Sequence, residues 1–246
     1  MPRRARVEVE GGLYHVYNRV ASGEPVFGDP EEALRFVEVI REVKRRDGWT
    51  LYAWCVMSNH YHLAIRSSVV PLWRGIHRVQ CSFSRGFNRR HGRTGGLWQS
   101  RYQAKLVDEE RYLGQLIAYV HLNPVRAGMV ADPVDHLFGG HREIVKRVST
   151  PLVDVDDVLL CYGESERAAR RSYLSAIAAG AEAMGASPAI SAGGIRSLKW
   201  TDRDLQPKPG QEYVDELGRS SGRERPRLSA ERFVGDARAN ELLTRK

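Results

Sequence analysis

The chain has 246 residues, of which 42% are hydrophobic and 28% charged, a composition typical of a globular protein with one large domain or one domain with extensions. No apolar run approaches the ~18 residues that a membrane-spanning helix needs, and the basic start MPRRARVEVEGG lacks the apolar region of a signal peptide. The three scattered cysteines, Cys55, Cys81 and Cys161, argue against a disulfide framework or a C-x-x-C zinc site and favour a reducing cytoplasm.

The net charge of +8 is concentrated in one segment. Between Pro71 and Lys105 there is no Asp or Glu. The cations of this segment are Arg74, Arg78, Arg85, Arg89, Arg90, Arg93, Arg101 and Lys105, and its aromatic residues include Trp73, Phe83, Phe87, Trp98 and Tyr102. Clustered arginines with interleaved rings favour a nucleic-acid surface, because arginine neutralises phosphates and rings stack on bases. The charge alone leaves open a solvated basic helix face.

Strand-like and helix-like patterns alternate along the first half of the chain. In chain order we expect a strand over 11–20, a helix over 30–48, strands over 49–57 and 60–67, a basic helix over 71–92, a strand over 103–108 and a third helix that starts at Asp108. The first helix has strong end signals, because Asp29 is a good N-cap, Pro30 suits the first turn and Gly48 suits the end.

The order β-α-β-β-α-β followed by a helix predicts an α+β fold of the ferredoxin-like (RRM-like) plan, an antiparallel sheet with helices on one face. We expect residues 1–150 to form this domain and residues 151–186 to form a C-terminal helical extension with two short helices. Residues 187–246, rich in Gly, Pro, Arg and Ser, are expected to be a flexible basic tail. Because many unrelated activities use this plan, the fold alone does not indicate a function.

The stretch VMSNHYHLAIR, residues 56–66, places two histidines in a predicted strand. Residues i and i+2 of a strand share a face, so His60 and His62 project together while Tyr61 points the other way. Two adjacent imidazoles can ligate one divalent metal. The H-x-H pattern alone is weak evidence, because it also arises by chance. On the first strand, His15, Tyr17 and Arg19 share one face in the same way.

The predicted third helix contains the stretch LIAYVHLNPVRAG, residues 116–128. Tyr119 and Asn123 lie four residues apart and so share a helical face. A tyrosine can act as a nucleophile, and an amide oxygen can be a third ligand for a hard cation. Pro124 is expected to kink or end the helix. Tyr112 is the rival nucleophile, and His121 is expected to point away from the face of Tyr119. Without the histidines, an ordinary core tyrosine would be the better interpretation.

The segments NHYHL and AYVHLNPVRAG, together with GLYHVYNR in the first strand, resemble the REP-associated tyrosine transposases, a branch of the single-tyrosine HUH transposases. The resemblance covers residues 8–150. It implies that His60 and His62 are metal ligands, that Asn123 is a third metal-side group and that Tyr119 is the nucleophile. It also implies Mg²⁺ or Mn²⁺ at this site, and we expect no small-molecule cofactor. The segment DHLFGGHREIV, residues 135–145, departs from the Trp-Ser-Ser type of sequence that relatives usually carry there.

The implied activity is metal-dependent cleavage and rejoining of single-stranded DNA through a 5′-phosphotyrosine intermediate. The implied substrate is a palindromic repeat folded as a hairpin. The candidate DNA contacts are His15, Arg19, Arg89, Arg90, Arg93, Arg101 and Arg126. We expect a monomer, with a dimer as the alternative, associated with the nucleoid in the cytoplasm.

Other functions remain open at the level of sequence. The first is a DNA-binding regulator of repeat elements that has lost cleavage, against which His60, His62 and Tyr119 argue. The second is an RNA-binding ferredoxin-like module, but the chain lacks the aromatic RNP run of such modules. The third is a relaxase or replication initiator of the HUH class. Those proteins tend to be larger, with the histidine strand after the tyrosine or with paired tyrosines.

Overall fold

Four antiparallel strands form the central sheet of the protein, which we analysed as a computed structural model that describes residues 8–107 and 112–185. The strands are β1 (Leu13–Arg19), β2 (Thr50–Val56), β3 (His60–Arg66) and β4 (Gln103–Val107). Their order in the sheet is β2-β3-β1-β4, which is that of the ferredoxin-like plan. The predicted fold class is therefore confirmed, and each strand lies within two residues of its predicted bounds.

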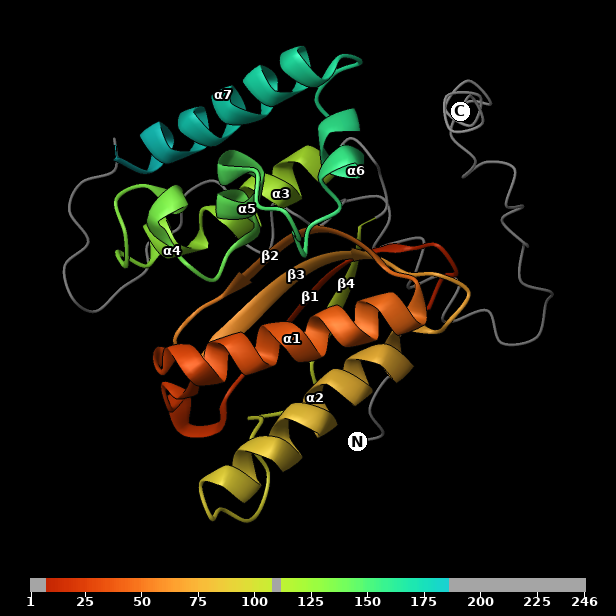
Figure 1. The fold of residues 1–246 in the computed structure, drawn as a ribbon, viewed down its shortest axis with the longest axis vertical. Coiled ribbons are helices and arrows are strands. Elements are labelled where there is room, and N and C mark those ends of the chain that lie inside the picture. Colours follow the sequence, from red (N-terminus) through yellow and green to blue (C-terminus); the bar gives the residue numbers. More distant parts are fainter. Residues whose placement is uncertain (1–7, 108–111, 186–246) are drawn as a thin grey trace, which may run out of the picture. The chain divides into compact units, whose positions relative to one another are not determined.

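Helices α1 (Pro30–Asp47) and α2 (Leu72–Arg90) pack side by side on one face of the sheet (Figure 1). The signals that predict α1 operate as expected, since the Asp29 side chain accepts a hydrogen bond from the backbone N–H of Glu31 and Gly48 ends the helix with φ 68°. The packing centres on Tyr61, whose ring lies 5.0 Å from that of Phe36 and whose hydroxyl accepts a 3.0 Å hydrogen bond from Gln80 Nε2.

The later helices lie on the other side of the sheet (Figure 1). They are α3 (Leu113–His121), α4 (Asn123–Arg126), α5 (Gly140–Lys146), α6 (Val155–Leu160) and α7 (Glu166–Gly185), and single 3-10 turns occur at Ala21–Gly23, Val26–Gly28 and Pro133–Asp135. The extension has the two predicted helices, although α7 is long rather than short, and α5 was not predicted. The expected start of the third helix at Asp108 and the tail over 187–246 lie outside the described residues. No helix in the described ranges is long and apolar enough to cross a membrane.

Helix α3 ends at His121, and α4 starts two residues later with Pro124 in its first turn. The expected interruption near the proline is therefore present. Asn123 nevertheless keeps a helical conformation, because it begins the new helix rather than ending the old one. The break leaves Tyr119 and Asn123 close to each other, with the Asn123 side-chain amide donating a 2.8 Å hydrogen bond to the Tyr119 carbonyl oxygen.

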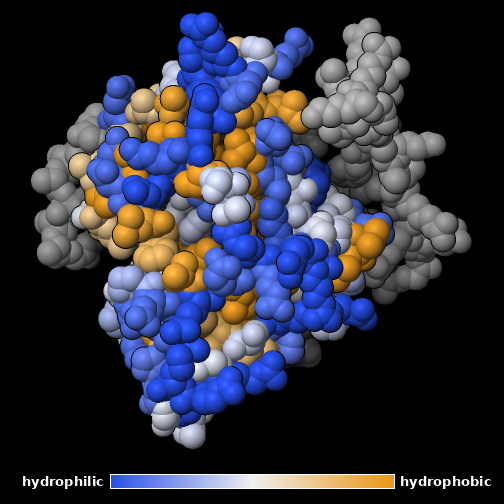
Figure 2. Space-filling model, viewed as in Figure 1, coloured by the Kyte–Doolittle hydropathy of each residue, from blue (hydrophilic) through white to orange (hydrophobic). Residues whose placement is uncertain are grey.

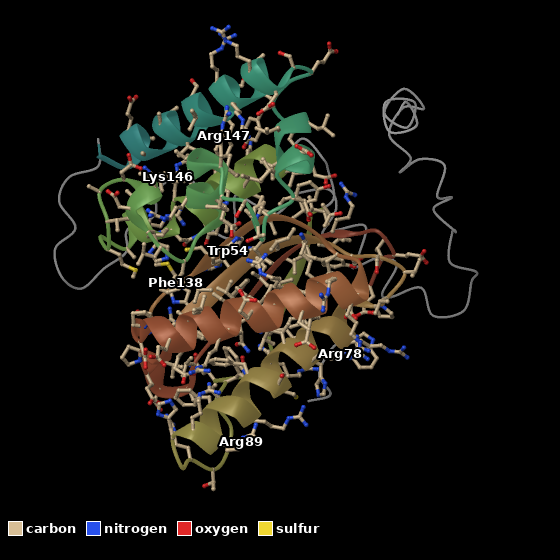
Figure 3. All side chains as sticks on the ribbon, viewed as in Figure 1. Trp54, Arg78, Arg89, Phe138, Lys146 and Arg147 are labelled. Carbon is tan, nitrogen blue, oxygen red and sulfur yellow. The ribbon has the colours of Figure 1, made fainter. Side chains whose placement is uncertain are left out.

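The segment after α4 covers the exposed edge of β2. The backbone N–H of Val56 donates to the Phe138 carbonyl oxygen at 2.9 Å, and the N–H of Asp154 donates to the Leu51 carbonyl oxygen at 3.0 Å. Figure 3 shows Phe138 close to this strand. Covered edge strands do not pair with other chains. The segment DHLFGGHREIV, residues 135–145, therefore contributes to the structure of this edge.

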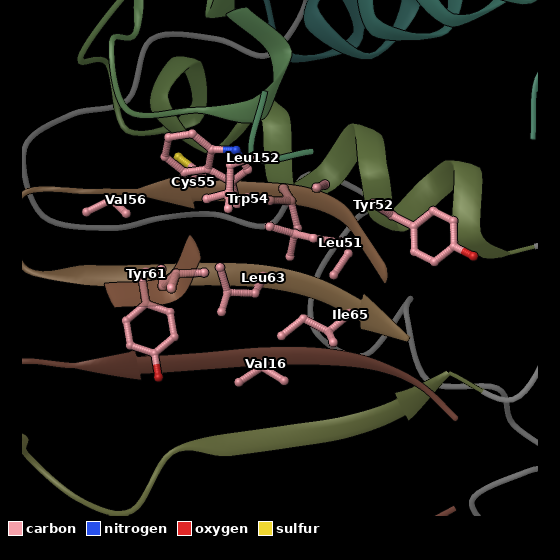
Figure 4. Close-up of a cluster of buried hydrophobic side chains, with 14 of the residues drawn as sticks. Val16, Leu51, Tyr52, Trp54, Cys55, Val56, Tyr61, Leu63, Ile65 and Leu152 are labelled. Carbon is pink, nitrogen blue, oxygen red and sulfur yellow. The ribbon is translucent and has the colours of Figure 1, made fainter. Parts of the chain in front are cut away.

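A hydrogen-bonded chain joins α7 to α3, the helix that carries Tyr119. The Tyr173 hydroxyl lies 3.0 Å from His121 Nδ1 and 2.6 Å from His141 Nδ1, and all three side chains are buried. His121 thus faces α5 and α7 and not the sheet, which confirms the prediction that it points away from the face of Tyr119. On the opposite face of the sheet, towards α1 and α2, the core is apolar and includes the buried side chains of Val16 and Leu63 (Figure 4).

Candidate active site

The register between β1 and β3 determines which side chains share the candidate site. His60 pairs with Arg19, and His62 pairs with Tyr17. Directly opposite residues of an antiparallel pair project from the same face, and Tyr61 between the histidines points to the α1–α2 face. The side chains of His60, His62, Tyr17 and Arg19 therefore gather on the face of the sheet opposite to α1 and α2.

Helix α3 brings Tyr119 to this same face. The Tyr119 ring centroid lies 5.9 Å from that of His62 and 5.4 Å from that of His15, both in edge-to-face orientation. The rings of His60 and His62 are 5.1 Å apart. The two histidines and the tyrosine, separated by more than fifty residues in the sequence, thus meet at one place. The rival Tyr112 packs against the hydrophobic core, of which Tyr119 is itself a member.

A hydrogen bond holds each histidine of the H-x-H pair in a defined orientation. His60 Nδ1 lies 2.7 Å from Asn59 Oδ1, and the Asn59 amide is itself oriented because its Nδ2 donates to the Gly23 carbonyl oxygen at 3.0 Å. His60 must therefore donate from Nδ1, which leaves the Nε2 lone pair for a ligand. His62 Nδ1 lies 3.0 Å from His15 Nε2, so a proton on His62 Nδ1 likewise leaves its Nε2 as the donor to a metal.

Burial keeps both histidines neutral. Burial, and to a lesser extent the positive charge of Arg19, lower the pKa of His60 to about 4. Burial also lowers the pKa of His62 well below its usual value, with added repulsion from His15, His60 and Arg126. Neutral imidazole is the form that ligates metals. At physiological pH both side chains are therefore in the protonation state that a metal ligand requires.

The donor set fits a hard or borderline divalent cation. Among residues 8–107 and 112–185, no group of three or more His, Cys, Asp or Glu side chains could hold a metal, so a third ligand drawn from these residues would be of another type. Asn123 is a suitable residue, because its Nδ2 donates to the carbonyl oxygens of Tyr119 and Val120 and its Oδ1 is the acceptor atom. Two imidazoles, an amide oxygen and water suit Mg²⁺ or Mn²⁺ better than a closed tetrahedral zinc site.

Arg126 lies directly over the ring of Tyr119. Its guanidinium carbon is 4.4 Å from the ring centroid, a cation–π contact. Its Nε and Nη2 atoms are buried and have no hydrogen-bond partner within the described part of the chain. Buried guanidinium donors without acceptors are costly. An anion placed beside Tyr119 would satisfy them.

The other predicted DNA contacts have different surroundings. His15 is only 1% exposed and lies within hydrogen-bond distance of His62, surroundings that suit a structural contact with His62 better than the predicted contact with DNA. Arg19 and Arg101 are exposed, and Arg19 lies next to His60. Arg90 and Arg93 form ion pairs with Glu32 and Glu24, whereas Arg89 is exposed on α2, on the opposite face of the sheet (Figure 3). In Figure 2 the surface over α2 is mainly hydrophilic.

Two neighbours of the site were not assigned a role from the sequence. Asn59 orients His60, and its position directly before the H-x-H pair was a usable signal. Lys105 lies with its ammonium 5.8 Å from the centroid of the Tyr17 ring, which in turn is 5.7 Å from the ring of His62. Only the pairing of β1 with β4 brings Lys105 to this place.

Comparisons with known proteins find a matching family model and a similar fold. Residues 8–123 match the model of a family described as IS200-like transposases. The solved structure of a REP-associated tyrosine transposase bound to a REP hairpin has the same fold, with a TM-score of 0.51, 19% sequence identity, and coverage of 63% of this chain and 93% of that chain. A crystal structure described as a "putative transposase from Deinococcus radiodurans R1" gives a TM-score of 0.34 at 19% identity, covering 49% of this chain and 94% of that chain. A search of curated proteins finds no match.

Proposed function

Because residues 8–123 form a domain of the IS200-like transposase family, we propose that this chain is a metal-dependent single-stranded DNA endonuclease and strand transferase. Its proposed substrate is a palindromic repeat folded as a hairpin. The observation that carries the proposal is the convergence of His60, His62 and Tyr119 on one face of the sheet, with ring centroids 5.1 Å and 5.9 Å apart.

Tyr119 is the proposed nucleophile. Its hydroxyl oxygen attacks the phosphorus of the scissile phosphate, the bond from phosphorus to the 3′ oxygen breaks, and the 3′ oxygen leaves as a hydroxyl after taking up a proton. The product is a 5′-phosphotyrosine that conserves the energy of the broken bond, so an incoming 3′-hydroxyl can reverse the step and transfer the strand. The phenol has an ordinary pKa of about 10 and must lose its proton to water. The guanidinium of Arg126, 4.4 Å from the ring centroid, stabilises the developing negative charge.

The Nε2 atoms of His60 and His62, with Asn123 Oδ1, are the proposed ligands of Mg²⁺ or Mn²⁺, which when bound supplies positive charge beside the scissile phosphate. Asn59 and His15 hold the two imidazoles in the orientation that this requires. The buried Nε and Nη2 donors of Arg126 support a direct contact with the same phosphate.

We assign the remaining DNA contacts by exposure. Arg19 is the last residue of β1 and Arg101 lies two residues before β4, and both side chains are exposed. These positions support contacts with the single-stranded part of the DNA. Arg89, exposed on α2, is a candidate contact for the hairpin stem. Arg90 and Arg93 are already ion-paired, so their proposed contribution is to the fold rather than to DNA. We propose that the protein acts as a monomer, which gel filtration with light scattering tests.

The test is formation of a covalent adduct. Purified protein is incubated with Mn²⁺ or Mg²⁺ and single-stranded oligonucleotides from palindromic repeats near its own gene, and protein-linked DNA is measured after denaturation. We expect an adduct that requires the metal and disappears in Tyr119→Phe. Tyr112→Phe is the matched control and should keep it. Hairpin binding without an adduct under any metal would overturn the enzymatic proposal in favour of a cleavage-inactive DNA-binding regulator.

A further inference from the structure

Within residues 8–107 and 112–185, the helices cover only part of the active-site face of the sheet. Helix α3 packs mainly against β2 and β3, the half of the sheet that carries the histidines. On β1 and β4 the same face carries side chains that are exposed or half-buried. These residues, which we call the open strip, are Tyr17, Arg19, Gln103 and Lys105.

The strand register aligns the open strip with the H-x-H pair. Tyr17 pairs with His62 on one side and with Gln103 on the other, so the three side chains form a row across the sheet. Neighbouring strands are about 4.8 Å apart. A group bound on Tyr17 would therefore lie one strand away from a phosphate held at His62. Lys105, the partner of His15 in the register, stands beside this row.

Tyr17 has the surroundings of a stacking platform. Its ring is half-buried, unlike the fully buried Tyr14 on the opposite face of the same strand. Its ring contacts the ring of His15, at 5.0 Å between centroids, and the ammonium of Lys105, which lies 5.8 Å from the Tyr17 ring centroid. The strip contains two cations, Arg19 and Lys105, and no carboxylate, which suits a polyanion.

We propose that the open strip is a binding subsite for unpaired nucleotides next to the scissile phosphate. One base stacks on Tyr17, and Lys105 and Arg19 hold the adjoining phosphates. Stacking of this kind tolerates any base, because every base has a π face. The subsite rests on the proposed function for its substrate class, and it would determine how the single strand is placed across the active site.

The test replaces one base at a time. A set of hairpin oligonucleotides carries an abasic site at each unpaired position beside the cleavage site, and adduct formation is measured as kcat/KM with wild type, Tyr17→Ala and Tyr17→Phe. We expect one abasic position to lower wild-type kcat/KM about tenfold, the loss of one stacked base. On the intact oligonucleotide, Tyr17→Ala should lower kcat/KM by about the same factor. With the oligonucleotide that is abasic at the sensitive position, Tyr17→Ala should show no further loss. Tyr17→Phe keeps the ring and should retain the abasic effect that Tyr17→Ala loses.

Trp73→Ala is the matched control, because it removes an exposed ring on α2, on the other face of the sheet. It should leave the pattern of abasic effects unchanged. The subsite would be overturned if each abasic position lowered kcat/KM of Tyr17→Ala as much as it does for wild type. It would also be overturned if Tyr17→Ala kept the wild-type kcat/KM on the intact oligonucleotide.

A second readout separates this proposal from the proposed function. The base at the sensitive position is replaced by 2-aminopurine, and its fluorescence is measured when the protein binds in the presence of EDTA. If no adduct forms and no sensitive position is known, 2-aminopurine is placed at each unpaired position in turn. Stacking should quench the fluorophore with wild type and with Tyr119→Phe, but not with Tyr17→Ala. An adduct without quenching would refute the subsite alone, and quenching without any adduct would refute only the nuclease.

Discussion

His15 Nε2 lies 3.0 Å from His62 Nδ1, in a buried contact between two strands. At this distance one of the two nitrogens donates a proton and the other accepts it, as the tautomers of the two rings determine. When the proton resides on His62 Nδ1, the Nε2 atom of His62 has its lone pair directed outward for a metal, and His15 acts as the acceptor that fixes this tautomer. We therefore propose His15 as a positioning residue for His62, the proposed metal ligand, since His15 is itself too deeply buried to contact DNA.

Replacing His15 by Phe should weaken metal binding while leaving DNA binding intact. The phenyl ring keeps the packing but cannot accept the His62 proton, and loss of such a contact typically costs 10–100-fold in metal affinity. We therefore expect the Mn²⁺ concentration that gives half-maximal adduct formation to rise about 10–100-fold, with full activity recovered at high Mn²⁺. The exposed His77 on α2 supplies the control variant His77→Phe. An unchanged Mn²⁺ dependence in His15→Phe would show that His62 is oriented in some other way.

Arg126 should affect the rate of cleavage more than the affinity for DNA. Its Nε and Nη2 atoms are buried without a hydrogen-bond partner among the described residues, and its guanidinium carbon lies 4.4 Å from the Tyr119 ring centroid, so its charge is beside the proposed nucleophile. Loss of one such donor costs on the order of 100-fold in kcat. We expect Arg126→Gln to lower single-turnover adduct formation by about that factor, with little change in Kd measured by fluorescence anisotropy. Arg126→Lys should recover only part of the rate, because lysine lacks the planar fork of donors. A loss confined to Kd would instead assign Arg126 to substrate binding.

The strands, α1 and α2 could be predicted because their signals are local. Alternation of side chains placed His60 and His62 on one face, and the four-residue spacing placed Tyr119 near Asn123. The roles of His15 and Lys105 could not be derived in this way. They depend on the register of β1 with β3 and β4, which pairs residues about fifty and ninety positions apart.

The basic segment shows a second limit of local patterns. Residues 71–105 contain no carboxylate, so counting within the segment suggested eight solvated cations. In the folded chain, Arg78, Arg90 and Arg93 form ion pairs with acidic residues that precede the segment, Asp47, Glu32 and Glu24. Part of the apparent nucleic-acid footprint therefore neutralises the chain's own acidic groups.

Tyr173→Phe should destabilise the protein through the junction of α3, α5 and α7. The hydroxyl lies 3.0 Å from His121 Nδ1 and 2.6 Å from His141 Nδ1, and its removal leaves two buried nitrogens without that partner. We expect a loss of about 1–3 kcal/mol in the free energy of unfolding, the usual cost of unsatisfied buried polar groups. Urea unfolding followed by circular dichroism measures it.

The matched comparison is Tyr162→Phe, which removes one hydrogen bond to the Gly114 carbonyl oxygen and should cost about 1 kcal/mol. If Tyr173→Phe costs no more than Tyr162→Phe, the chain of His121, Tyr173 and His141 does not stabilise the contact between α7 and α3.

Stability should fall as the pH is lowered below the ordinary histidine pKa. Burial lowers the pKa of His141 to about 4 and that of His121 well below its usual value, whereas an unfolded histidine titrates near 6.5. Between these values the unfolded chain binds protons that the folded chain does not. The contribution of each neutral histidine is therefore complete above about pH 6.5 and declines by about 1.4 kcal/mol per pH unit towards pH 4. Urea unfolding with EDTA at several values from about pH 7.5 to pH 4.5 measures the slope, and His141→Gln should reduce it by about one proton. A slope that His141→Gln leaves unchanged would mean that His141 is protonated in the folded protein as readily as in the unfolded chain.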